Sequence, residues 1–360
     1  MTTPERRYVS ISEIREFRSC QKRWEYLYRD RMRPVSSGVA RQVGKFVHRA
    51  LEEFWKGKSI ADTRKLLKKA QDHPFFKTDK GRIQLARAHA TITAYFAYWE
   101  SERDKWEVVE QDAGVERWVR GELDHLGLNA EIVGRVDVLA RWKETGVLHF
   151  IDSKTTSDDI STTGADFWQR LAMDIQATAY QELLQVEFQE PVKILFDAIS
   201  KIQSSPKLKK KVTKRKSETD EEFAERKKEN EEENRETPVE FSNRMTKEIL
   251  DAPTKWFQRR MIPRLQADID IFREERDTTI RDMMDPERTV FPRNDSACKS
   301  RFGPCHFLGV CTGIEAIDCG KFEHVPVSVP GFVEEPKKGR AKKRKEKGVE
   351  IDDFSDIPEF

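Results

Sequence analysis

Three cysteines lie close together near the end of the chain, and a fourth lies far upstream. The C-terminal stretch CKSRFGPCHFLGVC contains Cys298, Cys305 and Cys311, whereas Cys20 lies in EFRSCQKRWEYLY. Four thiolates can bind a zinc ion or an iron–sulfur cluster, and a site built from these four would join the two ends of the chain. Free cysteine is also a common small buried residue, so the spacing alone leaves that second interpretation open.

A second group of reactive residues lies mid-chain, on two segments with the alternating pattern of β-strands. In FIDSKTT, alternation places Asp152 and Lys154 on one face of a strand and Ile151 and Ser153 on the other. In VGRVDVLARW, Asp137 points away from the apolar face of its strand. Two carboxylates on adjacent strands suit a hard divalent cation, and a lysine beside them could orient or deprotonate water. An ordinary exposed Asp–Lys pair has the same pattern, so each signal alone is weak.

Two helical segments contain further candidate residues. GKFVH places Gly44 and His48 one helical turn apart, so that the missing glycine side chain would let His48 reach a metal ion. DIQATAY places Gln176 and Tyr180 at positions i and i+4, one above the other on a helix face. An amide and a phenol there could contact a phosphate or a base. A lone helical histidine is more often structural, and half-buried Gln–Tyr pairs are also common.

Strands and helices must position these residues, and the sequence pattern predicts both. Alternation predicts successive strands in GVERWVRG, NAEIVGRVDVLARW and GVLHFIDSKTT, and an apolar strand in VKILFDAI. Ser10 and Glu13 have the spacing of a capping box, which predicts a helix running through Cys20. Further helices are expected at about 43–55, over much of 60–105, at about 167–188 and at about 246–276. This order predicts an α/β or α+β core with a mixed sheet.

The distribution of charge separates a core from solvated segments. We expect a single domain over 1–330, with a helical insert at about 56–105 and a charged insert at about 201–236. The end of the chain, 331–360, is basic and then acidic, which predicts a disordered tail. No apolar run approaches about 18 residues, so we expect a cytoplasmic protein without a membrane span.

The order of the motifs is more specific than any one of them. GxxxH is followed by GRVD, DSK and QxxxY, with one cysteine before these motifs and three after them. This order resembles the RecB-like branch of the PD-(D/E)XK nucleases. It is most similar to the cysteine-bearing group that includes the CRISPR-associated RecB-family exonuclease, the AddB nuclease domain and phage-encoded relatives. The resemblance covers roughly Ser10 to Cys311. It implies a mixed central sheet flanked by helices, an N-terminal helical part and a C-terminal cysteine-rich metal-cluster segment.

The resemblance also implies roles for individual residues. Lys154 would position the attacking water and stabilise charge on the scissile phosphate, while Gln176 and Tyr180 would shape the substrate end of the site. The implied catalytic residues are Asp137, Asp152, Lys154, Gln176 and Tyr180. The implied ligands of Mg²⁺ or Mn²⁺ are His48, Asp137, Asp152 and the backbone carbonyl of Ser153.

A [4Fe–4S] cluster bound by Cys20, Cys298, Cys305 and Cys311 is the second site that the resemblance implies. Two features depart from the pattern of the family. Gln21 stands where many relatives have proline, and the interval from Cys298 to Cys305 is longer than their short form. Zinc or a metal-free state therefore stays open for these cysteines.

The implied function is metal-dependent hydrolysis of DNA, most simply by an exonuclease acting on single-stranded ends in a bacterial or phage-infected cell. Recombination, repair, replication and phage DNA metabolism are the processes that such an enzyme would serve. Low sequence preference is expected, because phosphate contacts carry no sequence information. Two other classes stay open, a non-catalytic DNA-binding adaptor with a stapled nuclease-like fold and a zinc-stapled interaction protein.

The acidic ending EIDDFSDIPEF resembles the tips of single-stranded DNA-binding proteins of bacteria and phages. Such a tip could recruit a replication or recombination protein by docking its terminal aromatic residue. An unstructured solubilising end is the alternative interpretation.

Overall fold

A computed structural model describes the chain except for residues 1–5, 36–38, 71–73, 210–212, 301–302 and 326–360. The tail expected over 331–360 lies outside the described residues, so that expectation and its proposed partner stay predictions. The chain divides into two compact units. Unit 1 combines Met1–Ser36, Trp118–Gly134 and Gln266–Phe360, and unit 2 combines Ser37–Arg117 and Arg135–Leu265.

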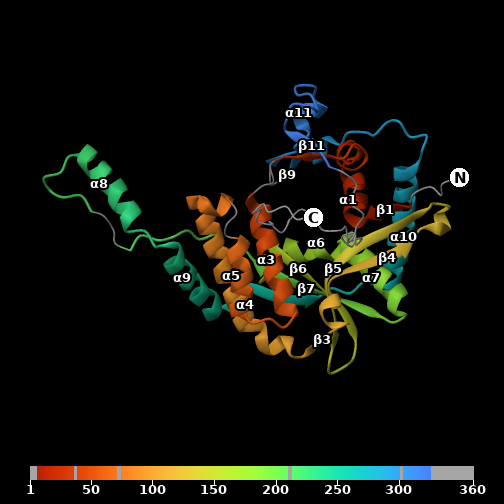
Figure 1. Ribbon diagram of the computed structural model, residues 1–360, viewed down its shortest axis with the longest axis horizontal. Coiled ribbons are helices and arrows are strands. Elements are labelled where there is room, and N and C mark those ends of the chain that lie inside the picture. The colour runs from red at the N-terminus through yellow and green to blue at the C-terminus, as the bar shows by residue number, and fades with distance from the viewer. Residues whose placement is uncertain (1–5, 36–38, 71–73, 210–212, 301–302, 326–360) are drawn as a thin grey trace, which may run out of the picture. The chain divides into compact units, whose positions relative to one another are not determined.

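The core of unit 2 is a mixed β-sheet (Figure 1). Its strands are β3 (Trp106–Val108), the later part of β5 (Ala130–Trp142), β6 (Leu148–Thr156), β7 (Val192–Ser200) and β8 (Phe257–Met261). Strands β5 and β6 run antiparallel, β6 and β7 run parallel, and β8 lies antiparallel on β7. The strands predicted in the segments of β5, β6 and β7 are confirmed, and so is the predicted α/β class with a mixed sheet.

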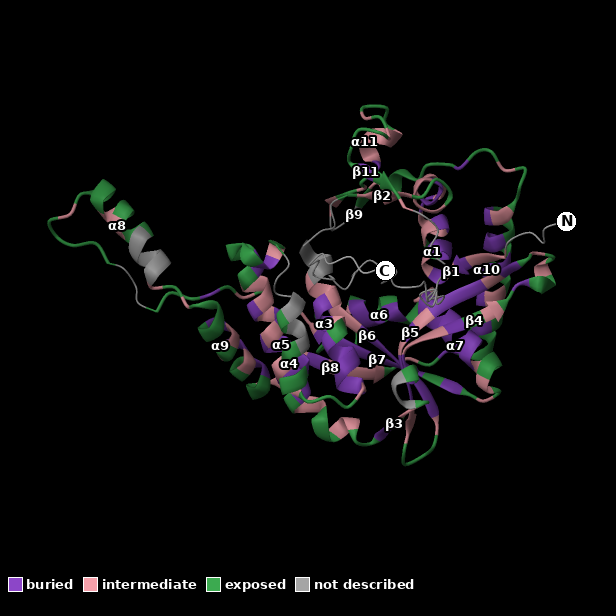
Figure 2. Cartoon of the chain, viewed as in Figure 1, coloured by how far each residue is buried: buried purple, intermediate pink, exposed green. Residues whose placement is uncertain are grey.

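Helices of unit 2 cover both faces of this sheet. They are α3 (Val39–Trp55), α4 (Ile60–Ala70), α5 (Asp79–Arg103), α6 (Asp166–Ala172), α7 (Ile175–Phe188), α8 (Asp220–Glu233) and α9 (Pro238–Asp251). On one face, Val138 and Ile151 pack in a core with apolar side chains of α3, α5 and α9. On the other face, the ring of Phe150 contacts Tyr180 of α7. Side chains of successive strand residues thus enter two apolar layers, and Figure 2 shows the strands buried.

The charged segment predicted at about 201–236 begins at the core, where Ile202 is buried, and its helix extends away from it. Helix α8 is largely exposed where the structure describes its side chains (Figure 2). A β-bridge between Leu208 and Arg235 joins the chain before α8 to the chain after it. Helix α9 then begins at Thr237, whose side chain forms a capping box with Glu240.

Two helix predictions were wrong in their bounds. The helix expected at about 246–276 is interrupted, because Pro253 and Pro263 cannot continue a helix and strand β8 lies between them. The helix expected at about 167–188 is split into α6 and α7. Asp174 begins α7 by accepting a hydrogen bond from the backbone N–H of Gln176 at 2.8 Å.

Unit 1 contains the two ends of the described chain and part of two strands. Its elements are β1 (Arg7–Ser10), α1 (Ile11–Ser19), α2 (Gln21–Trp24), β2 (Met32–Pro34), the later part of β4 (Val115–Glu122), the first part of β5, α10 (Gln266–Met284), β9 (Lys299–Ser300), β10 (Gly303–Pro304), α11 (Leu308–Cys311) and β11 (Phe322–His324). Strand β1 lies parallel to the first residues of β5, and β11 lies antiparallel to β2. The strand predicted in GVERWVRG is confirmed as β4.

Short turns complete the secondary structure. The 3₁₀ turns are Pro74–Lys77, Gln111–Gly114, Asp124–Leu126, Pro253–Lys255 and Asp295–Ala297, and Glu25–Arg29 forms a π-helix. Within the part of the chain that the structure describes, every helix is too short or too polar to span a membrane.

The N-terminal helix begins where the sequence predicts but ends earlier. Ser10 caps α1 by accepting a hydrogen bond from the backbone N–H of Glu13 at 3.0 Å. The carboxylate of Glu13 binds Arg7 and the indole N–H of Trp24, so it does not complete the capping box. Cys20 has an extended backbone between α1 and α2, and this break turns the helix that was expected to run through it into two.

Candidate active site and cysteine group

Strands β5 and β6 bring Asp137 and Asp152 to neighbouring positions. The two strands pair from Arg141↔Leu148 to Val138↔Ile151, and the acids occupy the next position on each strand. Beyond that point the backbone N–H of Ser153 donates a hydrogen bond to Oδ2 of Asp137 at 2.7 Å. A carboxylate therefore binds a strand amide at the point where the acids meet.

Asp152 and Lys154 share one face of β6, as the alternation predicts. The ammonium of Lys154 lies 2.9 Å from Oδ2 of Asp152. The pKa of Asp152 is raised to about 6, and burial is the largest cause. The ammonium of Lys154 lowers this pKa, whereas the carboxylates of Asp137 and Asp174 raise it. Burial alone would lower the pKa of Lys154, but the same three carboxylates raise it above its ordinary value. Lys154 is therefore a permanent cation suited to stabilising negative charge, and it is a poor candidate for deprotonating water.

Gln176 and Tyr180 lie one above the other on α7, and the structure gives them protein partners. The side-chain amide of Gln176 donates to the hydroxyl of Tyr180 at 2.9 Å. The ammonium of Lys154 donates to Oε1 of Gln176 at 3.5 Å, and the backbone N–H of Arg135 donates to the Tyr180 hydroxyl at 3.3 Å. Burial raises the pKa of Tyr180 to about 12, so its hydroxyl stays protonated. The pair connects α7 to Lys154 and to strand β5.

His48 of α3 approaches the same place from the other side of Asp137. Its Nδ1 atom lies 3.9 Å from Oδ2 of Asp137. A Cβ atom on Gly44, one turn earlier, would meet nothing within 4 Å, so the fold itself does not require glycine there. All seven predicted residues of this site lie in unit 2.

A small cavity of about 10 Å³ lies between α3 and the strands. His48, Asp137 and Ser153 line it, and so do Trp55 and Glu116. The buried hydroxyl of Ser153 and indole N–H of Trp55 have no hydrogen-bond partner in the described structure. The volume suits one atom-sized guest, and the carboxylate and imidazole donors suit Mg²⁺ or Mn²⁺. Nevertheless, no group of three or more His, Cys, Asp or Glu side chains among the described residues is arranged to hold a metal ion.

Sequence reasoning missed Glu116 and Arg135. Glu116 of β4 and Arg135 of β5 form an ion pair of 2.7 Å, and Glu116 lines the cavity beside Asp137. Burial, with the charge of Asp137, raises the pKa of Glu116 to about 8. The available signal was an acid within the strand pattern of GVERWVRG, but the pairing to Arg135 depends on how the two strands come together.

The four predicted cysteines lie in unit 1. The segment before Cys298 is tied to the neighbourhood of Cys20 by hydrogen bonds, in which Asn294 donates to the Ser19 carbonyl at 2.8 Å and Arg23 donates to the Ala297 carbonyl at 3.3 Å. These contacts place the segment that leads to Cys298 next to residues on either side of Cys20.

The thiols also interact with one another. Burial raises the pKa of the Cys311 thiol, and the neighbouring thiols of Cys305, Cys20 and Cys298 raise it further. The thiol of Cys311 raises the pKa of Tyr26, and the thiol of Cys305 raises the pKa of Arg23. Cys319 is exposed. Among the described residues the structure shows no cysteine group arranged to hold a metal ion, so the shared four-cysteine site stays a prediction, as does the identity of its metal or cluster.

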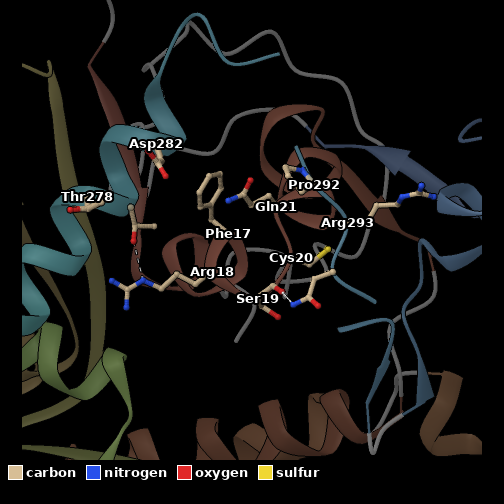
Figure 3. Close-up of a pocket in the computed structure, with 11 residues that line it drawn as sticks. Phe17, Arg18, Ser19, Cys20, Gln21, Thr278, Asp282, Pro292 and Arg293 are labelled. Atoms are coloured by element: carbon tan, nitrogen blue, oxygen red, sulfur yellow. Dashed lines mark hydrogen bonds between the residues drawn. The ribbon is translucent and has the colours of Figure 1, made fainter. Parts of the chain in front are cut away.

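A hollow of about 290 Å³ lies against the wall that contains Cys20 (Figure 3). Helices α1 and α10 and the segment 292–294 line it, and its side chains include Arg18, Gln21 and Asp282. Arg18 donates to Thr279 at 3.0 Å across this hollow. Cys20 is therefore buried next to an open polar surface that the sequence pattern did not predict.

A protein family and a solved structure are among the known proteins to which this chain is similar. A crystal structure of a protein from Eubacterium rectale named "Putative exonuclease" has a TM-score of 0.47 and 14% sequence identity, covering 89% of this chain and 91% of that chain. Comparison with curated proteins gave no match. The sequence pattern of the PD-(D/E)XK nuclease superfamily matches residues 8–312, which include strands β3 to β8, the acids and the four cysteines described above. The chain belongs to the PD-(D/E)XK nuclease superfamily.

Proposed function

We propose that this chain is a metal-dependent deoxyribonuclease that hydrolyses phosphodiester bonds at the ends of single-stranded DNA. The observation that carries the proposal is the Asp152–Lys154 ion pair of 2.9 Å beside Asp137, in a chain of this nuclease superfamily. The preference for single-stranded ends, and a role in recombination, repair, replication or phage DNA metabolism, rest on the resemblance to the cysteine-bearing RecB-like group.

The side chains of unit 2 divide the work of such a reaction. His48, Asp137, Asp152 and the carbonyl of Ser153 would hold Mg²⁺ or Mn²⁺. When bound, the cation would supply a lowered pKa for a coordinated water and a positive charge on a phosphate oxygen. Lys154, held as an ammonium, would stabilise the negative charge that develops on the scissile phosphate.

Gln176 and Tyr180 have a positioning role in this proposal. Their hydrogen bonds reach Lys154 on one side and the backbone of Arg135 on the other. Both side chains are buried, so they are suited to orienting the ammonium rather than to broad contact with DNA. This role differs from the substrate-shaping role that the resemblance implies.

We also propose that Cys20, Cys298, Cys305 and Cys311 bind a [4Fe–4S] cluster, with zinc as the less favoured guest. Soft thiolate donors suit either one. The mutual interaction of the four thiols around Cys311 supports a shared site. In this proposal the cluster joins the N-terminal helices of unit 1 to its C-terminal segment and has a structural role.

Cleavage of end-labelled single-stranded DNA with Mn²⁺ tests the proposal directly. Asp152→Ala and Lys154→Ala should each slow cleavage by about 100-fold or more, while DNA binding survives. Lys193→Ala is a matched control, because Lys193 is an exposed lysine on the adjacent strand β7. Near-normal cleavage by either site variant would overturn the assignment, and DNA binding without cleavage by the wild type would favour the adaptor.

A further inference from the structure

We propose that Glu116 and Arg135 are a positioning pair that holds Asp137 and the Gln176–Tyr180 pair in their working geometry. The inference deepens the proposed nuclease function and rests on it. The Nε atom of Arg135 lies 2.7 Å from Oε2 of Glu116, and the two side chains are only 15% and 18% exposed. Arg135 precedes Asp137 by two residues on β5, so both side chains lie on the same face of that strand.

Glu116 has an unusual backbone. Its φ of 54° lies in the left-handed region, although it occurs within strand β4 and is not glycine. Such a conformation is strained for a side chain with a Cβ atom and persists where the surroundings enforce it. The side chain of Glu116 is therefore directed by its backbone toward Arg135 and the cavity, at a cost in stability that glycine would avoid.

The cavity connects Glu116 to the proposed metal ligands. Glu52, Glu116 and Asp137 line it together with His48, so three carboxyl groups face one small space. Without Arg135, these carboxylates would repel one another at short range in a poorly hydrated place. The guanidinium of Arg135 is placed to offset part of this repulsion by pairing with Glu116.

The same pair reaches the other half of the site through hydrogen bonds. The backbone N–H of Arg135 donates to Tyr180, Gln176 donates to Tyr180, and Lys154 donates to Gln176. A displacement of Arg135 would therefore disturb Asp137 along the strand and Lys154 through α7. Residues that surround ligands in this way typically change metal affinity or activity by about 10–100-fold when they are replaced.

The chain offers a matched control on the same strand. Arg117 follows Glu116 directly and forms ion pairs of 2.5 Å with Glu110 and Glu187. Its side chain is also 15% exposed, but neither it nor its partners line the cavity. Replacement of Arg117 thus breaks an equally short ion pair of β4 without touching the proposed network.

The experiment measures Mn²⁺ affinity and cleavage rate for the full chain, in Glu116→Gln, Arg135→Met and the double variant. We expect each single variant to bind Mn²⁺ about 10-fold more weakly and to cleave about 10–100-fold more slowly. The double variant should match the single variants in Mn²⁺ affinity and cleavage rate, because each single replacement already removes the same interaction between Glu116 and Arg135. Arg117→Met should match the wild type in both measurements.

Glu116→Gly separates positioning from general stability. Glycine relieves the left-handed backbone, so Glu116→Gly should melt at a higher temperature than Glu116→Ala and still lose as much Mn²⁺ affinity. Unchanged Mn²⁺ affinity in all Glu116 and Arg135 variants would overturn the pair. Lost affinity in Glu116→Gln with normal affinity in Arg135→Met would also overturn it, because Glu116 would then be a direct ligand.

Asp152→Ala separates this inference from the proposed function. Suppose that Asp152→Ala binds Mn²⁺ more weakly and cleaves slowly, while the Glu116 and Arg135 variants keep wild-type Mn²⁺ affinity and cleavage rate. This result would refute only the positioning pair. Normal Mn²⁺ binding and cleavage in Asp152→Ala would refute the proposed active site itself.

Discussion

Replacement of Asp152 by asparagine should stabilise the metal-free protein at neutral pH while it abolishes cleavage. The Asp152 carboxyl is 7% exposed and lies near the carboxylates of Asp137 and Asp174. Burial and these neighbours oppose its ionisation, and Lys154 only partly compensates. Asparagine keeps the shape of the side chain and removes the charge, so it resembles the protonated acid that the fold prefers.

The magnitude follows from the shift in the pKa of Asp152. The folded value is about 6 against an ordinary value of 3.8. Between these values the folded state binds more protons than the unfolded state, so stability falls as pH rises and stays low above about pH 6. A shift of about two units corresponds to about 3 kcal/mol, in which the attraction to Lys154 is already included. Asparagine does not ionise, so the variant should keep the stability that the wild type loses as pH rises.

The assay is urea unfolding of the wild type and Asp152→Asn in EDTA, from pH 4 to pH 8. The variant should gain stability relative to the wild type as pH rises from 4 to 6, and lead by about 3 kcal/mol at pH 7. Added Mn²⁺ should stabilise the wild type more than the variant. A variant less stable than the wild type at pH 7, or a difference that does not change with pH, would refute the reasoning.

Glu190 provides a control of opposite sign. Its carboxylate pairs with Arg141, and this hydrogen bond lowers the pKa of Glu190 below its ordinary value. A carboxylate with a lowered pKa stabilises the folded state at pH values above its ordinary pKa, and this stabilisation is lost as the pH falls. Glu190→Gln should therefore lose a little stability at neutral pH, where Asp152→Asn gains it.

Three further replacements test the core, helix α3 and the cysteine group. Arg259→Met should lower the free energy of unfolding by about 3–5 kcal/mol in chemical denaturation, because the fully buried Asp197 loses its cationic partner at 3.1 Å and keeps only the hydroxyl of Tyr95. Equal stability would contradict a buried ion pair. Gly44→Ala should raise the free energy of unfolding by about 0.5–1 kcal/mol, because the added Cβ meets nothing within 4 Å. If cleavage falls while stability rises, substrate binds on that face of α3. Cys20→Ser should lose the colour and iron of anaerobically purified protein. Cys319 is exposed, and Cys319→Ser should keep both. Full colour in Cys20→Ser would contradict the four-cysteine site.

The part of the site that the sequence predicts best depends on local pattern. Alternation along one strand decides which side chains share a face, and this is enough to place Asp152 beside Lys154. The i and i+4 positions on one helix similarly bring Gln176 to Tyr180. Both placements follow once a segment is correctly predicted to be a strand or a helix. The apolar patterns of β6 and α7 are long enough to make that prediction.

The errors arose where helical spacing continued through a local interruption. Apolar spacing suggested a helix across Pro253 and Pro263, and the prolines were the stronger signal because they remove a hydrogen bond and clash with the preceding turn. The extended backbone at Cys20 has no such local mark. Its conformation is set by contacts with the 292–298 segment, which only tertiary structure provides.

Glu116 and Arg135 were missed for the same physical reason. An acid in a strand pattern is ordinary until its neighbours are known, and its left-handed backbone leaves no trace in the amino-acid type. The pair becomes visible when strand geometry places Arg135 against it and when the cavity places Asp137 beside it. Non-local ion pairs of this kind follow from how strands meet rather than from periodicity.

Unit 2 places several buried acids close together in a fold that does not favour their charge. Asp152 and Glu116 both have a raised pKa, and Asp137 contributes to both shifts. A hydrophobic core on one side of the sheet and α7 on the other keep these groups from relaxing into solvent. Cationic partners relieve part of the repulsion, Lys154 for Asp152 and Arg135 for Glu116, and a divalent cation at Asp137 would relieve more of it. Binding of a cation there would therefore recover the stability lost to these carboxylates and would couple metal affinity to folding of the site.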